Sequence, residues 1–319
     1  MQASITFDVD GLQRDPFPTE PTASQRSELH DLAHEVVLPR IAAWLRSVEV
    51  KATFFAIGGD VERSPQAYRA LAAEGHEIAN HTSSHPRDFS RLSVGAALAE
   101  IRMAHRSIER AVGIAPVGFR APGYTLSAAT VEALTACGYA YDASMMPSWS
   151  YVTLKQAFRL LGGARYRHYL FAQSYRCALA PHLPYPIAAR DIYRAASESS
   201  LTEIPITTLG WLQFPFIHAT TFRLPDAVRR MAMRASLRRP FFTLSFHDLE
   251  FADRRDFGSL PISSMTTPHA TIAIEQRLDE LSRIVKTAKQ SHRFVTMRES
   301  VTTAPCLSTG PVRRAVGTP

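Results

Sequence analysis

The amino-acid sequence predicts an α/β fold in which parallel strands form a sheet or a barrel. Short apolar runs rich in β-branched and aromatic residues alternate along the chain with longer segments of helical periodicity. This alternation is typical of repeated βα units. Polar side chains directly follow several of the short runs, at the places where parallel strands of such folds end in an active site.

Seven runs have the length and composition of strands, and the segments between them predict helices. The predicted strands are Ser4–Val9, Val50–Ile57, Glu77–Asn80, Gly118–Arg120, Thr202–Ile206, Phe241–Phe246 and Phe294–Met297. One helix is expected to start at Pro65 behind a Ser64 cap and to close at Gly75, and a second to run from a Ser127 cap to Gly138. Apolar residues at helical spacing predict two more, which are marked by Leu92, Leu98, Ile101, Ile108 and Val112, and by Ile272, Ile274, Leu278, Leu281 and Ile284.

The chain as a whole predicts one catalytic domain over residues 1–300. An insertion near residues 151–186, rich in Arg, Tyr, Phe and Leu, breaks the alternation. It is interpreted either as a basic, aromatic lid on a membrane surface or as an ordinary helical insertion. Residues 301–319 are dominated by Pro, Gly, Thr and Arg, and we expect this tail to be disordered.

Composition indicates a globular protein with a substantial core. The 319 residues are 45% hydrophobic and 20% charged, with a formal net charge of +7. Basic charge is compatible with anionic partners, including a membrane surface or a lipid-linked sugar, but we favour a scattered basic surface as its explanation. No compact Lys/Arg run carries interleaved aromatics, so nucleic acid is not an expected partner.

The cysteines and the N-terminus bear on the compartment. Cys137, Cys177 and Cys306 are too few and too far apart for a disulfide framework. Met1 leads directly into an apolar run with no basic segment before a long apolar one, so neither a signal peptide nor a membrane anchor is predicted. We expect a cytoplasmic protein, with peripheral contact at the inner membrane surface as a further hypothesis.

Four polar clusters follow predicted strands and are expected to converge. They are Asp8 with Asp10, His81 with His85, Arg120, and His247 with Asp248. Two imidazoles and a carboxylate form a ligand set that suits zinc, cobalt or nickel. The spacing of His81 and His85 is a weak signal by itself, because His30 and His34 have the same spacing in a charged helical pattern. We interpret the latter pair as a solvated helix face.

In the order of its motifs the chain resembles the polysaccharide deacetylases of the NodB-homology fold, carbohydrate esterase family four. The resemblance covers roughly residues 3–300 and rests on five motifs: 6–11 (TFDVDG), 81–85 (HTSSH), 119–124 (FRAPGY), 141–144 (YDAS) and 244–248 (LSFHD). It implies a distorted (β/α) barrel with seven parallel strands.

The resemblance also implies a role for each cluster. Asp10, His81 and His85 would bind the metal, and Asp8 would act as general base. Arg120 would orient Asp8, with Asp142 in turn pairing with Arg120. His247 would act as general acid, and backbone N–H groups at Gly123 and Tyr124 would bind the acyl oxygen.

Three features leave alternatives open. The family has two adjacent aspartates in its first motif, whereas Val9 separates Asp8 from Asp10 here, so the base and ligand roles are open to exchange. Asp248 either orients His247 or simply ends a strand. Glu203 and Glu250 are interpreted either as residues lining the sugar pocket or as surface charges.

The expected function is hydrolysis of an N-acetyl group from an amino sugar, in a glycan, a glycoside or a lipid-linked saccharide, with a divalent metal as cofactor. One alternative is an N-deformylase of a lipid-linked amino sugar. The other is a carbohydrate-binding relative that keeps the barrel but has lost turnover.

Overall fold

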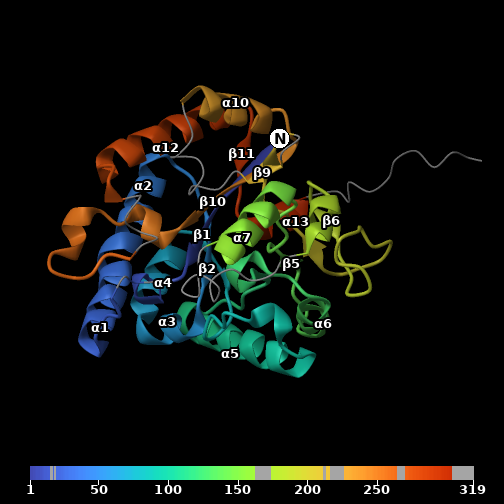
Figure 1. Ribbon diagram of the computed structural model, residues 1–319, viewed down its shortest axis with the longest axis horizontal. Helices are drawn as coiled ribbons and strands as arrows, with labels where there is room; N and C mark the ends of the chain where they lie inside the picture. The colour runs from blue at the N-terminus through green and yellow to red at the C-terminus, as the bar shows by residue number, and fades with distance from the viewer. Residues whose placement is uncertain are drawn as a thin grey trace, which may run out of the picture.

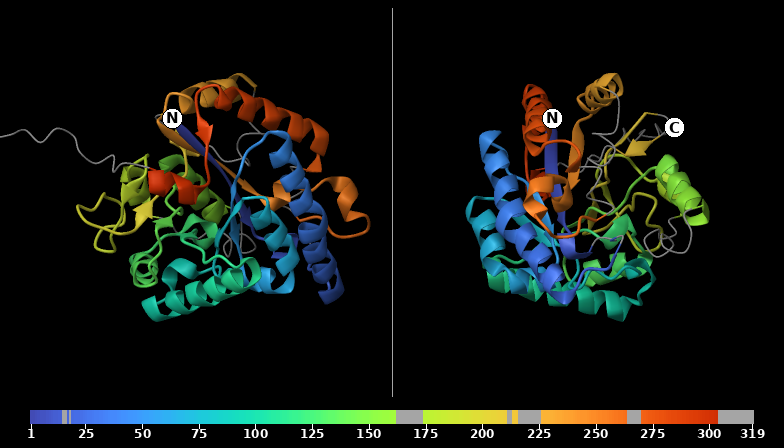
Figure 2. Two further views of the ribbon diagram at one scale, coloured as in Figure 1. Left: turned by 180° about the vertical axis from the view of Figure 1, so that it is seen from behind. Right: turned by 60° about the vertical axis from the view of Figure 1, so that its left-hand side comes forward.

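The strands form a curled, mostly parallel sheet with helices on its outer side, as Figures 1 and 2 show, and the predicted fold class is confirmed, although the sheet has nine strands within the residues that the structure describes, where seven were expected. The computed structural model describes residues 1–14, 17, 19–161, 174–210, 213–215, 226–263 and 270–303. Within them the main sheet has the strand order β10-β1-β2-β3-β4-β5-β7-β6, and β11 also pairs with β1. All pairs are parallel except β6 with β7.

The strands of the main sheet are β1 (Gln2–Val9), β2 (Thr53–Ala56), β3 (Glu77–Asn80), β4 (Gly118–Phe119), β5 (Tyr141–Asp142), β6 (Tyr185–Pro186), β7 (Thr202–Glu203), β10 (Phe241–His247) and β11 (Arg293–Phe294). A separate hairpin pairs β8 (Thr208–Leu209) with β9 (Phe214–Pro215). All seven predicted strands are present, several of them shorter than expected. Strands β5 and β6, and the hairpin strands β8 and β9, were not among the predicted strands.

The α-helices are α1 (Ala23–Leu32), α2 (Leu38–Ser47), α3 (Gly58–Arg63), α4 (Pro65–Ala73), α5 (Val94–Val112), α6 (Ala128–Ala136), α7 (Trp149–Leu161), α10 (Asp226–Ser236), α12 (Ile274–Lys289) and α13 (Met297–Thr303). A π-helical turn, η2 (Ala33–Val37), joins α1 to α2. Short 3-10 turns are η1 (Leu12–Arg14), η3 (Phe89–Arg91), η4 (Pro122–Tyr124), η5 (Tyr175–Leu179), η6 (Asp248–Phe251) and η7 (Arg254–Phe257).

Of the two predicted helix caps, Ser127 is confirmed and Ser64 is not. Ser127 accepts a hydrogen bond from the Thr130 N–H at 3.2 Å and caps α6 as expected. Ser64 occupies the capping position of α4 but makes no capping bond. Its hydroxyl lies instead 2.9 Å from Nε2 of His30, a contact with another helix that local sequence does not reveal.

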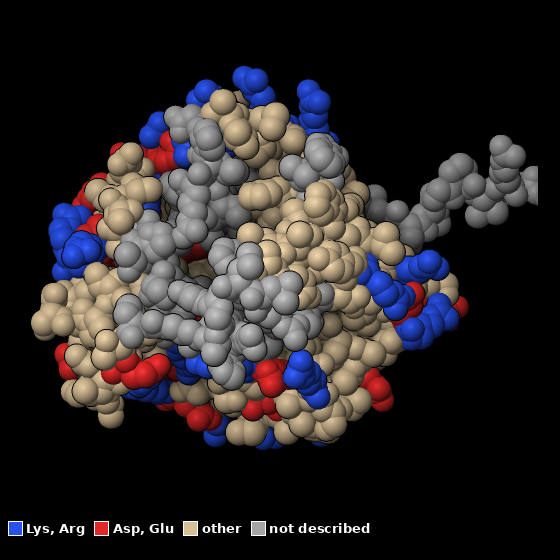
Figure 3. Space-filling model, viewed as in Figure 1, with Lys and Arg blue, Asp and Glu red and all other residues tan. Residues whose placement is uncertain are grey.

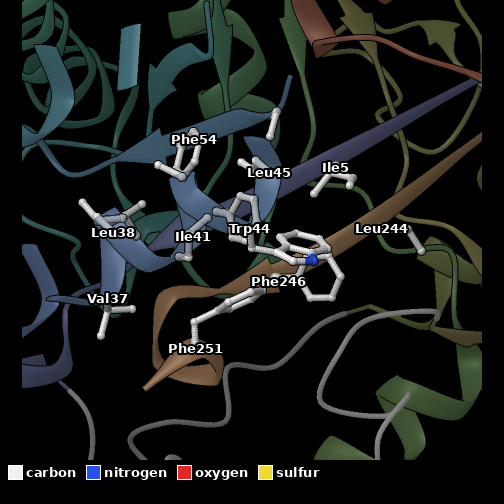
Figure 4. Packing of buried hydrophobic residues seen from close by; sticks show 14 of the residues in the cluster. Ile5, Val37, Leu38, Ile41, Trp44, Leu45, Phe54, Leu244, Phe246 and Phe251 are labelled. Carbon is white, nitrogen blue, oxygen red and sulfur yellow. The ribbon is translucent and has the colours of Figure 1, made fainter. Parts of the chain in front are cut away.

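The larger apolar core lies between β1, β10 and α2 (Figure 4). Ile41 and Leu45 face inward one helical turn apart, and Trp44 packs against Phe246 and Phe251 from the end of β10. Each such side chain contributes about 1.5–3 kcal/mol when fully buried. The packing therefore anchors the carboxyl ends of β1 and β10, where the polar clusters lie.

Gly118 on β4 is required by the packing of the neighbouring strand. A Cβ at this position would lie 1.8 Å from the ring of Tyr141. The Tyr141 ring passes over Gly118, and its hydroxyl donates to Oε1 of Glu77 at 2.9 Å. Strands β3, β4 and β5 are thus tied together beneath the site.

The predicted insertion and tail are only partly described. The insertion near 151–186 includes most of α7 and all of η5, and residues 162–173 lie outside the described part of the chain. Residues 301–303 of the predicted tail form the end of α13, and 304–319 also lie outside it. No helix in the described ranges has the length and hydrophobicity needed to cross a bilayer.

Candidate metal and catalytic site

Parallel pairing brings the first and fifth motifs together. Asp8 on β1 is the register partner of His247 on β10, so both side chains stand at the carboxyl end of the sheet. Asp10 follows β1 by one residue, and His81 follows β3 directly. Asn80, the last residue of β3, pairs with Phe119 beside Arg120. The predicted convergence of the clusters is therefore observed.

Asp10, His81 and His85 form a cluster that fits a divalent metal. Oδ1 of Asp10 lies 3.2 Å from Nε2 of His81 and 3.5 Å from Nε2 of His85. One ligand atom from each of the three lies within 4.8 Å of the others. Asp10 Oδ1 and His85 Nε2 are buried and receive no hydrogen bond from the described residues. Buried polar atoms without partners, aimed at one point, are what a cation site requires.

The electrostatics of the cluster suit a metal as well. Burial is the largest effect on His85 and lowers its pKa to about 4, which leaves the imidazole neutral and able to bind a metal at pH 7. Burial opposes ionisation of Asp10, but the neighbouring His85 and His81 outweigh it and lower the Asp10 pKa. Nδ1 of His81 lies 2.7 Å from the carbonyl oxygen of Arg120, which turns Nε2 toward Asp10.

The loop of residues 81–85 is held in an unusual conformation. Thr82 and His85 have φ values of 69° and 55°, in the left-handed region that non-glycine residues rarely adopt. The Asn80 side chain accepts from the Thr82 N–H, and the Thr82 hydroxyl accepts from the His85 N–H. Glu100 on α5 binds the two serines between the histidines. These contacts compensate the strain and aim His85 at the cluster.

Asp8 has a different environment from Asp10. Its Oδ1 accepts from the fully buried Arg120 guanidinium at 2.5 Å, and Oδ2 lies 3.7 Å from Nε2 of His247. His247 Nε2 is also 3.9 Å from Asp10. The two aspartates therefore face the same side, as expected for residues two apart on a strand. Asp10 faces the histidine pair, whereas Asp8 lies between Arg120 and His247.

The side chains of the site differ in how far they are exposed to solvent. The side chains of Asp10, His85 and His247 remain 19–20% exposed, while those of His81 and Asp8 are at most 3% exposed. Solvent therefore reaches the site at the first three side chains.

Glu250, rather than Asp248, stands beside His247. Its Oε1 lies 3.8 Å from Nδ1 of His247, and its Oε2 accepts from the His247 N–H at 3.1 Å. Burial lowers the His247 pKa, but Glu250, Asp8 and Asp10 together raise it well above its usual value. Asp248 accepts from the Gly11 N–H at 2.9 Å and joins the fifth motif to the first. The surface-charge interpretation of Glu250 is wrong, because the residue is 2% exposed.

Asp142 does not pair with Arg120 as predicted. Its Oδ1 accepts from the Ser144 hydroxyl at 2.7 Å, and its Oδ2 accepts from the Ser144 N–H at 3.3 Å. The Arg120 guanidinium donates to Asp8, to Thr6 and to a backbone carbonyl. Arg120 therefore contacts Asp8 directly, whereas Asp142 contacts Ser144.

The third motif forms the turn η4. A hydrogen bond inside this turn already occupies one of the two N–H groups that were predicted to bind the acyl oxygen. Gly123 has a φ of 62° and Tyr124 a φ of 59°. The Tyr124 N–H donates to the Ala121 carbonyl at 3.1 Å, so the prediction that it binds the acyl oxygen is wrong in this conformation. The Tyr124 ring instead packs edge-on against His247, at 6.2 Å between centroids. The role of the Gly123 N–H stays a prediction.

A second histidine pair, His30 and His34, is buried rather than solvated, contrary to the prediction. Their rings stack at 4.0 Å near Asp60, and the three ligand groups also lie within 4.8 Å of one another. Stacked rings direct their lone pairs in parallel instead of toward one point, and His34 Nε2 already bonds the Tyr68 hydroxyl at 3.0 Å. The Arg14 guanidinium occupies both oxygens of Asp60. This cluster therefore fits a hydrogen-bonded core better than a metal.

Arg14 contacts the site but is not among its predicted residues, and Glu250 was expected to line the sugar pocket or to be a surface charge, not to contact His247. Arg14 donates to the backbone carbonyl of Asp10 at 2.9 Å and also to Asp60, so it connects the end of β1 to Asp60. No sequence signal marks it. Glu250 stands three residues after His247, in the spacing of a capping box, and that pattern was available in the sequence.

Comparison with known proteins agrees with the geometry. Residues 27–141 match the polysaccharide deacetylase family model, a segment that contains the second and third motifs. The chain is 42% identical over 85 residues to a chitooligosaccharide deacetylase of Bradyrhizobium sp.. It is 36% identical over 84 residues to a peptidoglycan-N-acetylglucosamine deacetylase of Bacillus cereus. Each match covers 26% of this chain, and 38% and 30% of the relatives, so the chain spans about a third of their length.

The fold is also shared with a solved structure. A Mycobacterium smegmatis protein assigned as a polysaccharide deacetylase superimposes with a TM-score of 0.53 and 20% identity, over 98% of this chain and 94% of the other. That likeness concerns the fold alone. The family match over residues 27–141, the ordered motifs and the converging side chains are thus all similar to those of the polysaccharide deacetylases, the NodB-homology group of carbohydrate esterase family four.

Proposed function

We propose that this protein is a metal-dependent hydrolase that removes the N-acetyl group from an amino sugar. The observation that carries the proposal is the position of Asp8, which contacts Arg120 at 2.5 Å and lies 3.7 Å from His247, directly beside the cluster of Asp10, His81 and His85. Amide hydrolysis needs a base, an acid and charge stabilisation within one small site. The relatives named as chitooligosaccharide and peptidoglycan deacetylases support an N-acetylated sugar as substrate.

Each side chain has a chemical task in this proposal. A zinc, cobalt or nickel ion held by Asp10, His81 and His85 would polarise the acyl carbonyl and acidify water. Asp8 takes a proton from the water that adds to the acyl carbon, and Arg120 keeps the Asp8 carboxylate in place. As the carbon–nitrogen bond breaks, His247 gives a proton from Nε2 to the departing amine. The products are acetate and the free amino sugar.

Acetate release from defined substrates tests the proposal. We expect turnover of an N-acetylated chitooligosaccharide, loss of turnover after chelation, and recovery on adding zinc, cobalt or nickel. Acetate is measured with a coupled assay, and formate release from an N-formylated glycoside is the second arm. Formate release without acetate release would favour the deformylase. Sugar binding without any release, at full metal occupancy, would favour a carbohydrate-binding protein.

We also propose peripheral contact with an anionic membrane, through the exposed face of α10. Arg230 and Arg234 on α10, and Arg238 in the turn that follows it, are exposed at intervals of four residues, and none has an acidic partner among the described residues. Met231 is 64% exposed beside them. Basic side chains gather along the upper edge of Figure 3, where Figure 1 places α10. Arginines around an exposed apolar side chain suit phospholipid headgroups.

Vesicle flotation tests this contact. We expect the chain to float with phosphatidylglycerol vesicles, not with phosphatidylcholine vesicles, and to lose binding when Arg230, Arg234 and Arg238 are all changed to Gln. The matched control changes Arg102, Arg106 and Arg110 on α5, which have the same spacing and exposure but include a pair with Glu62 at 2.7 Å. Equal loss in both triple variants would show that only net charge matters and would remove the assignment to α10.

A further inference from the structure

Two carboxyl side chains, Asp142 and Glu203, meet inside the protein beside the site. They are register partners on the parallel strands β5 and β7, and both are 0% exposed. Directly opposed like charges on neighbouring strands are destabilising. Burial makes the repulsion stronger, because the dielectric constant is low and no water screens the charges.

The hydrogen bonds around the pair leave one carboxyl oxygen without a donor. Glu203 Oε1 accepts from the Met145 N–H at 2.9 Å, and both oxygens of Asp142 accept from Ser144. Glu203 Oε2 is buried and receives no hydrogen bond from the described residues. As register partners on neighbouring parallel strands, the Glu203 and Asp142 side chains project from the same face of the sheet, beside each other. A proton on Glu203, donated to Asp142, satisfies the remaining oxygen and removes the repulsion.

The surrounding charges favour this arrangement. Arg120, which directly follows β4, lowers the pKa of both carboxyls by its charge, but its guanidinium already pairs with Asp8. Tyr185 on β6 also faces the pair and is neutral, because burial raises its pKa. Burial and the charge of Asp142 raise the pKa of Glu203 well above its usual value. Burial raises that of Asp142 too.

The pair connects directly to the third motif. The Ser144 hydroxyl donates to Asp142 and accepts from the Ala121 N–H at 2.7 Å. The carbonyl of Ala143, between them, accepts from Nε of Arg120 at 2.9 Å. The segment after β5 therefore holds both the guanidinium that orients Asp8 and the start of the turn that carries Tyr124.

We propose that Glu203 is a positioning residue that carries a proton, donates it in a hydrogen bond to Asp142, and through Ser144 fixes Arg120 and the turn of residues 121–124. The consequence for turnover rests on the proposed deacetylase function. The shared proton and its effect on stability do not, and unfolding measurements test them without substrate.

The substitution Glu203→Gln tests the proposal, because glutamine donates and accepts in the same places without ionising. We expect kcat to stay within about twofold of wild type, whereas Glu203→Ala lowers kcat by about 10–100-fold with little change in metal content. Because the folded-state pKa of Glu203 is raised, the unfolded chain releases this proton first as pH rises above about 4.5, and wild-type stability falls. Glu203→Gln removes that loss and raises Tm at pH 7–8 by about 2 °C or more.

Glu77 on β3 provides a matched control. Burial raises the pKa of Glu77 as well, but both of its oxygens already accept hydrogen bonds, from the Thr53 and Tyr141 hydroxyls and from the Arg298 N–H. The amide group of Glu77→Gln would lose at least one of these acceptors, so this variant should lower Tm. Two results would overturn the proposal. One is a kcat of Glu203→Gln as low as that of Glu203→Ala. The other is a Tm of Glu203→Gln that falls with rising pH as much as the Tm of the wild type. If no substrate is found, the Tm comparison between Glu203→Gln and Glu77→Gln still decides the proton assignment.

Discussion

Replacing His81 or His85 with alanine is expected to remove both bound metal and deacetylase activity. Each imidazole supplies one of three ligand atoms within 4.8 Å of one another, and two ligands alone hold a divalent ion weakly. A catalytic metal stabilises the transition state by several kcal/mol, so kcat/KM should fall by at least about 10³-fold. Elemental analysis of the purified variants measures the metal, and acetate release measures the rate.

His34→Ala is the control, because His30 and His34 repeat the spacing of His81 and His85. This variant should keep its metal and most of its activity. It should be less stable by about 1–3 kcal/mol, since the buried Tyr68 hydroxyl loses its partner. A His81 or His85 variant with full metal content and the wild-type rate would contradict the assignment of the metal site.

The two aspartates of the first motif are expected to fail in different ways. Asp10→Asn should lose the metal, because Asp10 Oδ1 lies 3.2 Å and 3.5 Å from the two histidine nitrogens. Asp8→Asn should keep the metal and lose about 10²–10⁴-fold in kcat, as expected for removal of a general base. Metal content and kcat, measured on the same preparations, separate the two roles.

Folding must be checked for Asp8→Asn, because the variant leaves the buried Arg120 charge uncompensated, at a cost of about 3–5 kcal/mol. Asp8→Glu preserves the charge and serves as the second variant. It should fold and bind metal, with a lower kcat because the carboxylate is displaced. The reverse pattern, metal loss in the Asp8 variants and retention in Asp10→Asn, would show that the roles are exchanged.

The fold was predictable wherever an element was long enough to show its own pattern. Strand β1 and helix α5 are examples, because their apolar residues repeat with the period of a strand or a helix. Strands β5 and β6 have two residues each and exist only because neighbouring strands supply their hydrogen bonds. The prediction for His30 on α1 was wrong because it also depends on contacts with distant segments. His30 lies in a charged local sequence and looks solvated, yet it is buried against α4 and Asp60.

The candidate site was predictable in its residues more than in its contacts. All the predicted side chains gather at the carboxyl ends of the strands, since parallel strands bring their ends to one edge. The partners of Asp142 and His247 were not predictable in the same way. Which donor reaches a carboxylate depends on differences of an ångström or two, and Ser144 and Glu250 are closer than the alternatives that the motifs suggested.

The sequence by itself determined that this is a parallel α/β protein, that its polar clusters converge, and that two imidazoles and two carboxylates are available for metal and proton chemistry. Only the tertiary structure separated the carboxylates: Asp10 faces His81 and His85, and Asp8 faces Arg120. It also separated two histidine pairs of identical spacing. The reason is physical, because a ligand or a base is defined by the direction of its lone pairs and by its neighbours, and both depend on contacts between segments far apart in the chain.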